Sequence, residues 1–429
     1  MTSCGISQPI SGADPTNTRT TNTREAASTP AKPKRTSTVF AGENTKSATP
    51  QPTKQPDSAL SRHGVIQNCI SVQPSLPENQ RYTGWLVFET HEIKSDNTIS
   101  LYHFDSNKTV DIANHGRSVS VSPDKKSFAF YDWDLQNLEI LSASGEKINS
   151  LAWEKTWVAI SGWLDQQHLI LLTEPQKDTY PRPMTVLNPF TKESFILNSD
   201  YPDIDKSAGN ILNWQLWGIT AYNSLLNRVV YLGTMTVNGE GGMGYTLYGL
   251  PEKIILAQFL VQRFNQLPLW FPDGSKFIVK GDGEFIQVSA DGKISEVSHM
   301  NPDFEYGGAT GLVYFSDKYY SWSPDGQHLA FWLVKFSGEY DWQNREPTLA
   351  ILDTYSGTIL DTCISAGYNP HFSYFERDPI WSPDGKSIVV AANYSLEQNS
   401  NEVVVVDLEK WEAYKVLENR FPAGWMINP

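Results

Sequence analysis

Several segments of the chain place aromatic rings beside carboxylates, a combination that suits the binding of another molecule. Asp132-Trp133-Asp134 is the most compact of these segments, and Tyr340-Asp341-Trp342 has a similar mixture. Exposed rings with carboxylates at their rims can hold sugars, cationic groups or peptides. Each ring could instead simply pack its own loop onto the body of the protein. The candidate binding residues are Asp132, Trp133, Asp134, Tyr180, Tyr245, Tyr306, Tyr340, Asp341, Trp342, Tyr368 and Tyr394.

The motifs of covalent and metal-dependent chemistry are missing from the sequence. No Gly-x-Ser-x-Gly nucleophile motif occurs, and the eight His residues form neither His-x-His nor His-Glu-x-x-His. Asp132 to Asn137 offers oxygen ligands but lacks the Gly and the distal Glu of a calcium loop. The glycines of Gly239 to Gly244 lack the strand-to-helix context of a phosphate-binding loop. We therefore predict no metal and no cofactor.

Charge is distributed unevenly along the 429 residues. The whole chain carries a net charge of −14, whereas its first 60 residues carry +3. An acidic body repels phosphate backbones, so we do not expect nucleic acid to be a partner. The acidity could also serve only to keep the protein soluble.

The N-terminal segment has the composition of a tether. Of the first 60 residues, 26 are Ser, Thr or Pro, and the apolar residues among them are isolated. Such a segment cannot bury enough surface to offset its ordering entropy. We therefore predict a disordered Ser/Thr/Pro-rich tether over residues 1–64 and a folded domain over residues 65–429.

The three cysteines suggest export. Ser3 and Cys4 resemble the end of a bacterial lipoprotein signal, in which a small residue precedes a Cys that becomes lipid-modified. Met1 stands where that motif usually has Leu, and the charged and apolar regions of an export signal are absent from this sequence. Either the start was assigned too late or the signal was trimmed, or Cys4 is an accidental residue of a cytosolic tail. If Cys4 carries lipid, Cys69 and Cys363 remain, either as a disulfide that clamps the N-terminal entry or as two unrelated buried thiols.

One turn motif recurs along the chain between apolar segments. It is clearest in Trp270–Val279, Trp322–Phe331 and Trp381–Val390, which share an aromatic residue followed two positions later by Pro-Asp-Gly. Val121–Phe130 has the same pattern without the Gly. Pro and Asp favour the corners of a type I turn, and Gly takes the left-handed position that follows. Each motif therefore predicts a tight β-hairpin.

Weaker matches to the same register occur in Trp163–Leu172, Tyr222–Tyr231 and, weakest, Asn79–Phe88. The seven starts lie 42 to 59 residues apart, near the length of a four-stranded propeller blade. Two further strands follow each hairpin, as in Glu402–Asp407 and Ala413–Leu417. The chain is therefore predicted to be all-β, a seven-bladed β-propeller of four-stranded antiparallel blades. Six blades are the alternative if the match at Asn79 is accidental.

The repeat also suggests where its aromatic residues lie. The rings that open the registers should be buried where neighbouring blades pack face to face. These residues are Trp163, Tyr222, Trp270, Trp322 and Trp381.

The Trp-Ser-Pro-Asp-Gly-Lys motif at Trp381, followed by an apolar strand and a strand that ends in Asp407, resembles the WD-like repeats of TolB-type propellers. The resemblance is strong over residues 270–417 and fades toward Asn79. Related repeats occur in the propeller domains of prolyl oligopeptidases and dipeptidyl peptidases, but this chain lacks their nucleophile motif. The resemblance implies ring closure by a strand from the opposite terminus, so Arg420–Met426 should complete the first blade.

Connection lengths distinguish the two faces of the predicted propeller. The Pro-Asp-Gly, Ser-Gly and Asp-Gly turns fall on one face, and the long connections fall on the other, where loops commonly carry function. The long connections are Glu174 to Arg182, Val237 to Tyr245, Asn301 to Lys318, Phe336 to Glu346, Ala366 to Asp378 and Tyr394 to Asn401.

These observations favour a non-catalytic binding or scaffolding propeller outside the cytoplasm, anchored to a bacterial membrane only through lipid on Cys4. Its aromatic and acidic loop face would bind a protein, peptide or glycan, and we expect a monomer. The alternative is a propeller enzyme, similar to a glycosidase or lactonase, with two or three carboxylates converging in the central funnel.

Overall fold

The computed structural model describes the chain from Val65 to Asn428 as strands and turns. Its described residues contain no helix, and thus none that could cross a membrane. The predicted tether of residues 1–64, with Cys4, lies outside the described part. The described ranges are 65–79, 82–90, 97–153, 158–173, 184–197, 215–223, 225–237, 240–250, 252, 254–261, 268–280, 284–299, 313–336, 345–368, 378–395 and 400–428.

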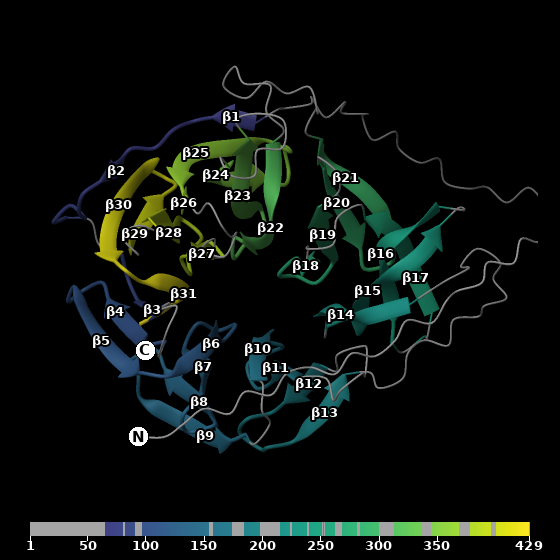
Figure 1. Cartoon of the computed structure of the whole chain (residues 1–429), viewed down its shortest axis with the longest axis horizontal. Coiled ribbons are helices and arrows are strands. Elements are labelled where there is room, and N and C mark those ends of the chain that lie inside the picture. The colour runs from purple at the N-terminus through teal and green to yellow at the C-terminus, as the bar shows by residue number, and fades with distance from the viewer. Residues whose placement is uncertain are drawn as a thin grey trace, which may run out of the picture. The chain divides into compact units, whose positions relative to one another are not determined.

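Seven sheets follow one another around a ring, so the fold is a seven-bladed β-propeller, as predicted (Figure 1). From innermost to outermost strand, blades 1 to 3 are β31 (Phe421–Met426), β3 (Trp85–Glu89), β4 (Ile99–His103), β5 (Lys108–Ala113); β6 (Gly116–Val121), β7 (Ser127–Asp132), β8 (Asn137–Ser142), β9 (Lys147–Ala152); and β10 (Val158–Trp163), β11 (Leu169–Thr173), β12 (Met184–Leu187), β13 (Ser194–Leu197). Blades 4 and 5 are β14 (Gln215–Asn223), β15 (Arg228–Val237), β16 (Glu240–Gly249), β17 (Ile254–Val261); and β18 (Leu269–Trp270), β19 (Lys276–Lys280), β20 (Glu284–Ser289), β21 (Ile294–His299). Blades 6 and 7 are β22 (Val313–Trp322), β23 (His328–Phe336), β24 (Arg345–Asp353), β25 (Ile359–Ser365); and β27 (Ile380–Trp381), β28 (Ser387–Ser395), β29 (Ser400–Asp407), β30 (Glu412–Glu418).

The C-terminal strand closes the ring, as the repeat implied. Strand β31 pairs antiparallel with β3, and Trp425 lies opposite Leu86. The Trp425 side chain is 1% exposed and its ring lies 5.1 Å from Phe104 and 6.0 Å from Tyr82. The weak sequence match at Asn79 is therefore a genuine blade, whose inner strand comes from the other end of the chain.

A segment that we call the strap, Val65–Gln73, runs along the outer edges of blades 6 and 7 (Figure 1). Its strands β1 (Val65–Gln67) and β2 (Val72–Gln73) pair in parallel with β25 and β30. Between them, a disulfide joins Cys69 to Cys363 with their Cα atoms 4.9 Å apart. The indole N–H of Trp411 also donates to the Asn68 carbonyl at 3.0 Å. A further short strand, β26 (Gly367–Tyr368), pairs in parallel with β28.

The hydrophobic core lies between successive blades rather than at one centre. One cluster joins Trp332 and Leu349 of blade 6 to Ile388 and Val404 of blade 7. Burial of these facing surfaces supplies most of the favourable free energy of folding. The turns and loops lie at the two ends of each blade, outside this core.

Three of the recurring tryptophans donate a hydrogen bond to the blade before their own. The indole N–H groups of Trp163 and Trp381 donate to the carbonyls of Ser120 and Ser321, each at 3.0 Å on the innermost strand of the preceding blade. The predicted burial is confirmed for Trp381, which is 5% exposed. The other four residues that open registers are only half-buried.

The Pro-Asp-Gly motif folds as the residue types dictate. In the blade 7 turn, the Ser382 hydroxyl donates to Asp384 Oδ1 at 2.6 Å, and the Lys386 N–H donates to the same oxygen at 3.1 Å. Gly385 has φ of +73°. Where the Gly is lost, Lys125 takes the same left-handed conformation, with φ of +60°.

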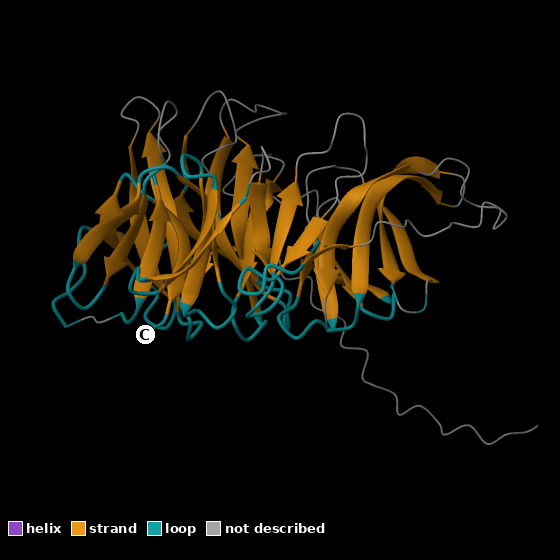
Figure 2. Ribbon diagram, turned by 90° about the horizontal axis from the view of Figure 1, so that it is seen from below, coloured by secondary structure: helices purple, strands orange, loops and turns teal. Residues whose placement is uncertain are grey.

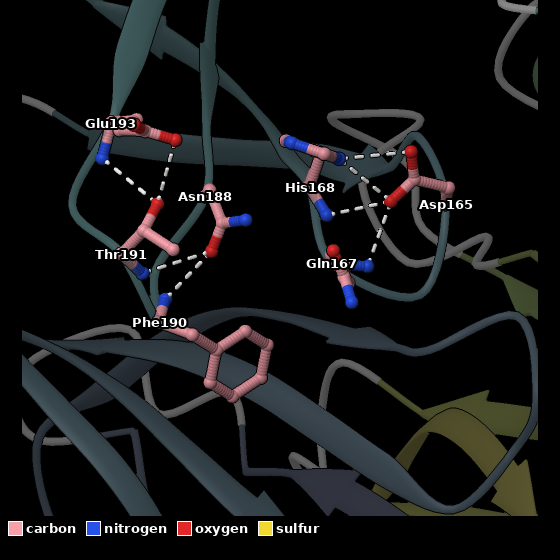
Figure 3. Close-up of polar contacts among 7 residues, drawn as sticks. All are labelled: Asp165, Gln167, His168, Asn188, Phe190, Thr191 and Glu193. Atoms are coloured by element: carbon pink, nitrogen blue, oxygen red, sulfur yellow. Dashed lines mark hydrogen bonds and ion pairs between the residues drawn. The ribbon is translucent and has the colours of Figure 1, made fainter.

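Blade 3 forms its two turn-side hairpins with other residues, and its first turn is shorter than the Pro-Asp-Gly turn of blade 7 (Figure 3). Asp165 Oδ1 accepts the backbone N–H groups of Gln167 and His168 at 2.7 and 2.9 Å. In the next hairpin, Asn188 Oδ1 accepts those of Phe190 and Thr191 at 2.9 and 3.0 Å. In the first hairpin, the Asp165 side chain that caps its own turn thus replaces Pro-Asp-Gly, which explains why the sequence match was weak there. Asn188 makes the cap that Asp353 and Asp407 make in the equivalent turns of blades 6 and 7.

We call the side with these tight turns, which join first to second and third to fourth strands, the turn side, and the opposite side the loop side. Figure 2 shows the described turns of the turn side along one edge of the ring. The predicted long loop from Val237 to Tyr245 is wrong, because β15 and β16 continue as one hairpin that pairs Val237 with Glu240. The middle of the other long connections lies outside the described residues.

Candidate functional site

Trp133 is fixed in a four-residue turn on the loop side of blade 2, between β7 and β8. Asp132 Oδ1 accepts the N–H groups of Asp134 and Leu135 at 3.1 and 3.0 Å. The Trp133 N–H donates to the His115 carbonyl at 2.9 Å. The backbone of the turn is therefore held by hydrogen bonds within the turn and by one to His115, the residue before β6. Asp132, predicted as a binding carboxylate, uses one oxygen to build the turn.

A bulge in β6 brings a cation to the ring. The pairing of β6 with β7 shifts between Arg117 and Ser120, and Ser118 adopts φ of +57°. The Val119 N–H donates to Glu89 Oε1 of blade 1 at 2.8 Å, which satisfies a backbone group that the bulge removes from the ladder. Bulges re-aim side chains in this way.

The Arg117 guanidinium lies over the indole of Trp133, with its carbon 5.0 Å from the ring centroid. Tyr131 meets the same indole edge-on, with the ring centroids 5.9 Å apart. Burial, and secondly the neighbouring Asp132 carboxylate, raises the pKa of Tyr131 above its ordinary value, so this phenol stays neutral. The Trp133 side chain itself is 36% exposed, and Arg117 is exposed. An aromatic ring with a cation against it is thus available to solvent.

An ion pair stands beside this stack. His115 Nε2 lies 3.0 Å from Asp134 Oδ2, and their side chains are 32% and 57% exposed. We refer to His115, Arg117, Trp133 and Asp134 as the Trp133 cluster. It offers a guanidinium donor, a carboxylate acceptor and an apolar ring on one accessible surface. Trp and Arg side chains of this kind carry much of the energy at protein interfaces.

Three other predicted binding residues lie in described strands. Tyr245 is in the middle of β16 and is 0% exposed, and Tyr394 is in β28 and is 5% exposed. Their assignment to an exposed face is therefore wrong, because strand pairing extends through both positions. The buried environment raises the pKa of each phenol. Tyr368 lies in β26, but its side chain is outside the described part of the structure, so its role stays a prediction.

The remaining predicted binding residues lie outside the described residues and stay predictions. They are Tyr180, Tyr306, Tyr340, Asp341 and Trp342.

Sequence reasoning missed Arg117, His115 and Glu89. Arg117 and His115 precede the Ser-Pro-Asp motif of blade 2 by only a few positions. Extending the repeat register backwards would have placed both at the loop-side start of an innermost strand. Glu89 gave no such signal, because its role depends on a bulge in the neighbouring blade.

Within the described part of the chain, no three His, Cys, Asp or Glu side chains gather closely enough to hold a metal ion. A surface pocket of about 380 Å³ lies between the chain after the strap, blade 1 and blade 7. It includes Leu76, Tyr102 and Lys415 among its lining residues. The Tyr102 hydroxyl donates to Asn107 at 2.8 Å, and Lys415 pairs with Glu402 at 3.0 Å. These groups are engaged with one another, so the Trp133 cluster is the better candidate site.

No family model and no curated protein sequence matches the chain. Among solved structures, TolB from Acinetobacter baumannii is 12% identical, with a TM-score of 0.38, over 80% of this chain and 65% of that chain. The chain thus spans less than two thirds of that TolB. An oligogalacturonate lyase in complex with manganese is 12% identical, with a TM-score of 0.44, over 78% of this chain and 85% of that chain. A putative TolB from Agrobacterium tumefaciens is 13% identical, with a TM-score of 0.36, over 65% of this chain and 88% of that chain. TolB propellers, which the repeat motif resembles, are thus among the similar structures, and the likeness concerns the β-propeller fold.

Proposed function

We propose that this protein is a non-catalytic binding propeller that recognises a protein, peptide or glycan through the loop side of its ring. The supporting observation is the exposed stack of Arg117 on Trp133, with its centroid distance of 5.0 Å, beside the His115–Asp134 pair. The ring supplies apolar contact, the guanidinium binds carboxylates or carbonyls, and Asp134 accepts hydrogen bonds.

Binding rather than covalent chemistry suits the way these groups are held. Asp132 caps its own turn, and Asp134 faces His115 rather than a second carboxylate. The alternative, a glycosidase-like or lactonase-like enzyme, needs two or three carboxylates that converge on one reacting atom. An exposed guanidinium that lies on an aromatic ring, as that of Arg117 does, is suited to recognition of a ligand surface.

The test is an array of peptides and glycans probed with the full chain and with the variants Trp133→Ala and Arg117→Met. We expect a defined set of ligands for the parent and loss of that set with either variant. The matched control is Tyr355→Ala, which removes a 94% exposed ring from the turn side and should leave binding unchanged. Binding that survives Trp133→Ala would contradict the proposed site, and cleavage of an arrayed glycan would favour the enzyme instead.

We further propose that the protein works outside the cytoplasm, held to a bacterial membrane by lipid on Cys4. The Cys69–Cys363 disulfide supports an oxidising compartment, because such bridges are rare in the reducing cytosol. Mass spectrometry of the N-terminal peptide from the native membrane fraction should show a lipid on the cysteine. The variant Cys4→Ala should leave the fold intact and release the protein into the soluble fraction; retention in the membrane would contradict the anchor.

A further inference from the structure

The Arg117 guanidinium of blade 2 is a positive charge that the protein does not neutralise. Among the described residues it contacts the Trp133 indole, with its carbon 5.0 Å from the ring centroid, and it makes neither a hydrogen bond nor an ion pair. The Arg117 side chain is exposed. Its N–H groups, which form a rigid planar fork, are therefore available to an acceptor on a ligand.

Three carboxylates around the Trp133 cluster are engaged by other donors. Asp132 Oδ1 accepts two N–H groups of its own turn, and Asp134 Oδ2 lies 3.0 Å from His115 Nε2. Glu89 Oε1 of blade 1 accepts a backbone N–H of the β6 bulge at 2.8 Å. None of the three pairs with Arg117, whose charge therefore stays uncompensated in a protein of net charge −14.

The position of this cation is set by the sheet and by the indole. Arg117 lies opposite Tyr131 in the pairing of β6 with β7, directly before the bulge, and Trp133 lies two positions further along, diagonal to Arg117. Diagonal neighbours of this kind are within reach of one another when one of them is long or aromatic. Because the indole holds the guanidinium before a ligand arrives, less conformational entropy is lost on binding.

The same contact limits the charge that a ligand can carry. A cationic group would meet the Arg117 charge at the face of the indole that the guanidinium covers, so this face is closed to cations. A polyanion would be repelled by the net charge of −14, because each of its charges lies in the field of the whole protein. A single carboxylate in an otherwise uncharged ligand avoids both penalties.

An apolar surface adjoins the cation. Leu135 is 61% exposed and Trp133 is 36% exposed, and both belong to the four-residue turn between β7 and β8. Covering such side chains with an apolar group of a ligand is favourable, because it removes apolar area from water. The turn therefore offers contact for an aliphatic or aromatic side chain beside the Arg117 charge.

We infer that the ligand of the Trp133 cluster is a peptide segment in which one carboxylate adjoins an apolar side chain. The carboxylate accepts hydrogen bonds from the Arg117 fork, and the apolar side chain covers Trp133 and Leu135. An Asp or Glu side chain and a C-terminal carboxylate share this chemistry. A neutral glycan has no carboxylate, and an acidic polysaccharide repeats the charge that the protein repels. This inference rests on the proposed binding function and narrows its class of ligand.

The test measures binding of the full chain to immobilised pools of short peptides by surface plasmon resonance. Three pools have blocked ends and a central Glu-Leu, Gln-Leu or Lys-Leu pair, with uncharged residues randomised on either side. The Glu-Leu pool should bind at least about tenfold more tightly than the Gln-Leu pool, because its acceptor is charged, and the Lys-Leu pool should bind most weakly. A fourth pool, with uncharged residues and a free C-terminal carboxylate on a final Leu, identifies the chain end as the source if it binds more tightly than the Glu-Leu pool.

The variant Arg117→Gln should remove the preference for a carboxylate, so that the Glu-Leu and Gln-Leu pools bind alike. Arg117→Lys should keep part of the preference, since it retains the charge but not the planar fork. The matched control Lys126→Gln removes an equal charge from an exposed position on the turn side and should leave the preference unchanged. Leu135→Ser should weaken binding of the Glu-Leu and Gln-Leu pools by the same factor, because it removes apolar contact and leaves Arg117 in place. All four side chains that are replaced lie at the surface, so the variants should melt with the parent.

The possible failures of this inference and of the proposed site are distinguishable. Equal binding of the Glu-Leu and Gln-Leu pools by the parent, with loss of both in Trp133→Ala, would overturn the inference and leave the proposed site in place. A preference for the Glu-Leu pool that survives Arg117→Gln would also overturn it. Binding of an oligouronate in place of every peptide pool would overturn it in favour of a glycan. Peptide binding that Trp133→Ala leaves unchanged would instead contradict the proposed site itself.

Discussion

Carboxylates build turns on both sides of the propeller, as Asp132 does on the loop side, but the loop side of blade 2 also has a carboxylate with another role. On the turn side, Asp384 accepts hydrogen bonds from a serine hydroxyl and a backbone N–H of its own turn. In the equivalent turn of blade 5, the backbone and side-chain hydrogen bonds from Ser275 lower the pKa of Asp273 below its ordinary value. On the loop side of blade 2, Asp134 instead meets His115, beside an indole that is open to solvent. The acidic residues of the repeated turns therefore stabilise the fold. Residues that bind a ligand are better sought on the loop side, where the repeat is least regular.

The largest expected effect comes from removing a repeat tryptophan. Trp381 is 5% exposed, packs with Ile388 and Val390, and donates to the Ser321 carbonyl. Trp381→Ala should lower the free energy of unfolding by about 3–5 kcal/mol, because it leaves a cavity between blades 6 and 7. Denaturant unfolding measures the loss. Trp381→Phe, which keeps an aromatic ring but loses the indole donor, should cost less; equal losses for the two variants would argue against the packing role.

The fold was predictable because its signals are local. Aromatic residues two positions before Pro-Asp-Gly define a hairpin within ten residues, and those hairpins fix where each blade begins. Even the weak match at Asn79 was correct, since the apolar segment Trp85–Glu89 needed only an inner strand from the C-terminus.

The site was less predictable because it depends on contacts between elements. Trp133 stood out by its type, whereas Arg117 reaches it only through a bulge in β6. Tyr245 and Tyr394 look like loop residues in the sequence, but their strands continue beyond the ends that the apolar pattern suggests. Strand length is set by the partner strand as much as by local composition.

The strap lies at the outer rim, apart from both the turn side and the loop side. Removing its disulfide should cause the next largest loss of stability. The bridge spans 294 positions of the sequence, so it constrains the unfolded chain strongly. The double variant Cys69→Ser/Cys363→Ser should lose about 2–4 kcal/mol of stability. Reduction of the parent should reproduce that loss in thermal melts. Melts that coincide with and without reductant would show that strand pairing alone holds the strap.

A buried carboxylate next to the bridge should make stability depend on pH. Asp361 is 0% exposed, and burial raises its pKa to about 6 even though its carboxylate accepts the Cys363 N–H. Because the folded pKa exceeds the unfolded value of 3.8, the folded state binds the proton more tightly. Its contribution to stability is therefore most favourable at low pH and declines as pH rises through about 6.

The variant Asp361→Asn isolates this effect, since it keeps the oxygen that accepts the Cys363 N–H but cannot ionise. The difference in melting temperature between variant and parent should grow in favour of the variant as pH rises from about 4 to about 6, and then level off. A difference that is constant over this range would mean that Asp361 titrates normally.

A smaller effect on stability is expected from the residue in the left-handed position of the turn, which is Gly385 in blade 7 and Lys125 in blade 2. Lys125 and Gly385 occupy equivalent positions with φ of +60° and +73°. Lys125→Gly should stabilise the protein by up to about 1 kcal/mol, because the left-handed conformation is costly only for a residue with a Cβ. Gly385→Ala should destabilise it by about 1 kcal/mol through the backbone, since the added Cβ would come no nearer than 3.4 Å to Pro324. Changes of the same sign in both variants would contradict this account of the turn.

The smallest effects on stability are expected in the Trp133 cluster, although the Trp133 side chain should matter most for binding. The ring is 36% exposed, it contacts Arg117 and Tyr131, and its turn is held by backbone contacts that the indole does not make. Trp133→Ala should therefore change the free energy of unfolding by about 1 kcal/mol or less. Asp134→Asn should change it less still, because exposed ion pairs contribute little. Denaturant unfolding of Trp133→Ala beside Trp381→Ala makes the contrast between the two sides measurable. If both variants lost similar stability, Trp133 would be part of the architecture, and the case for the loop side as a binding surface would lose its main support.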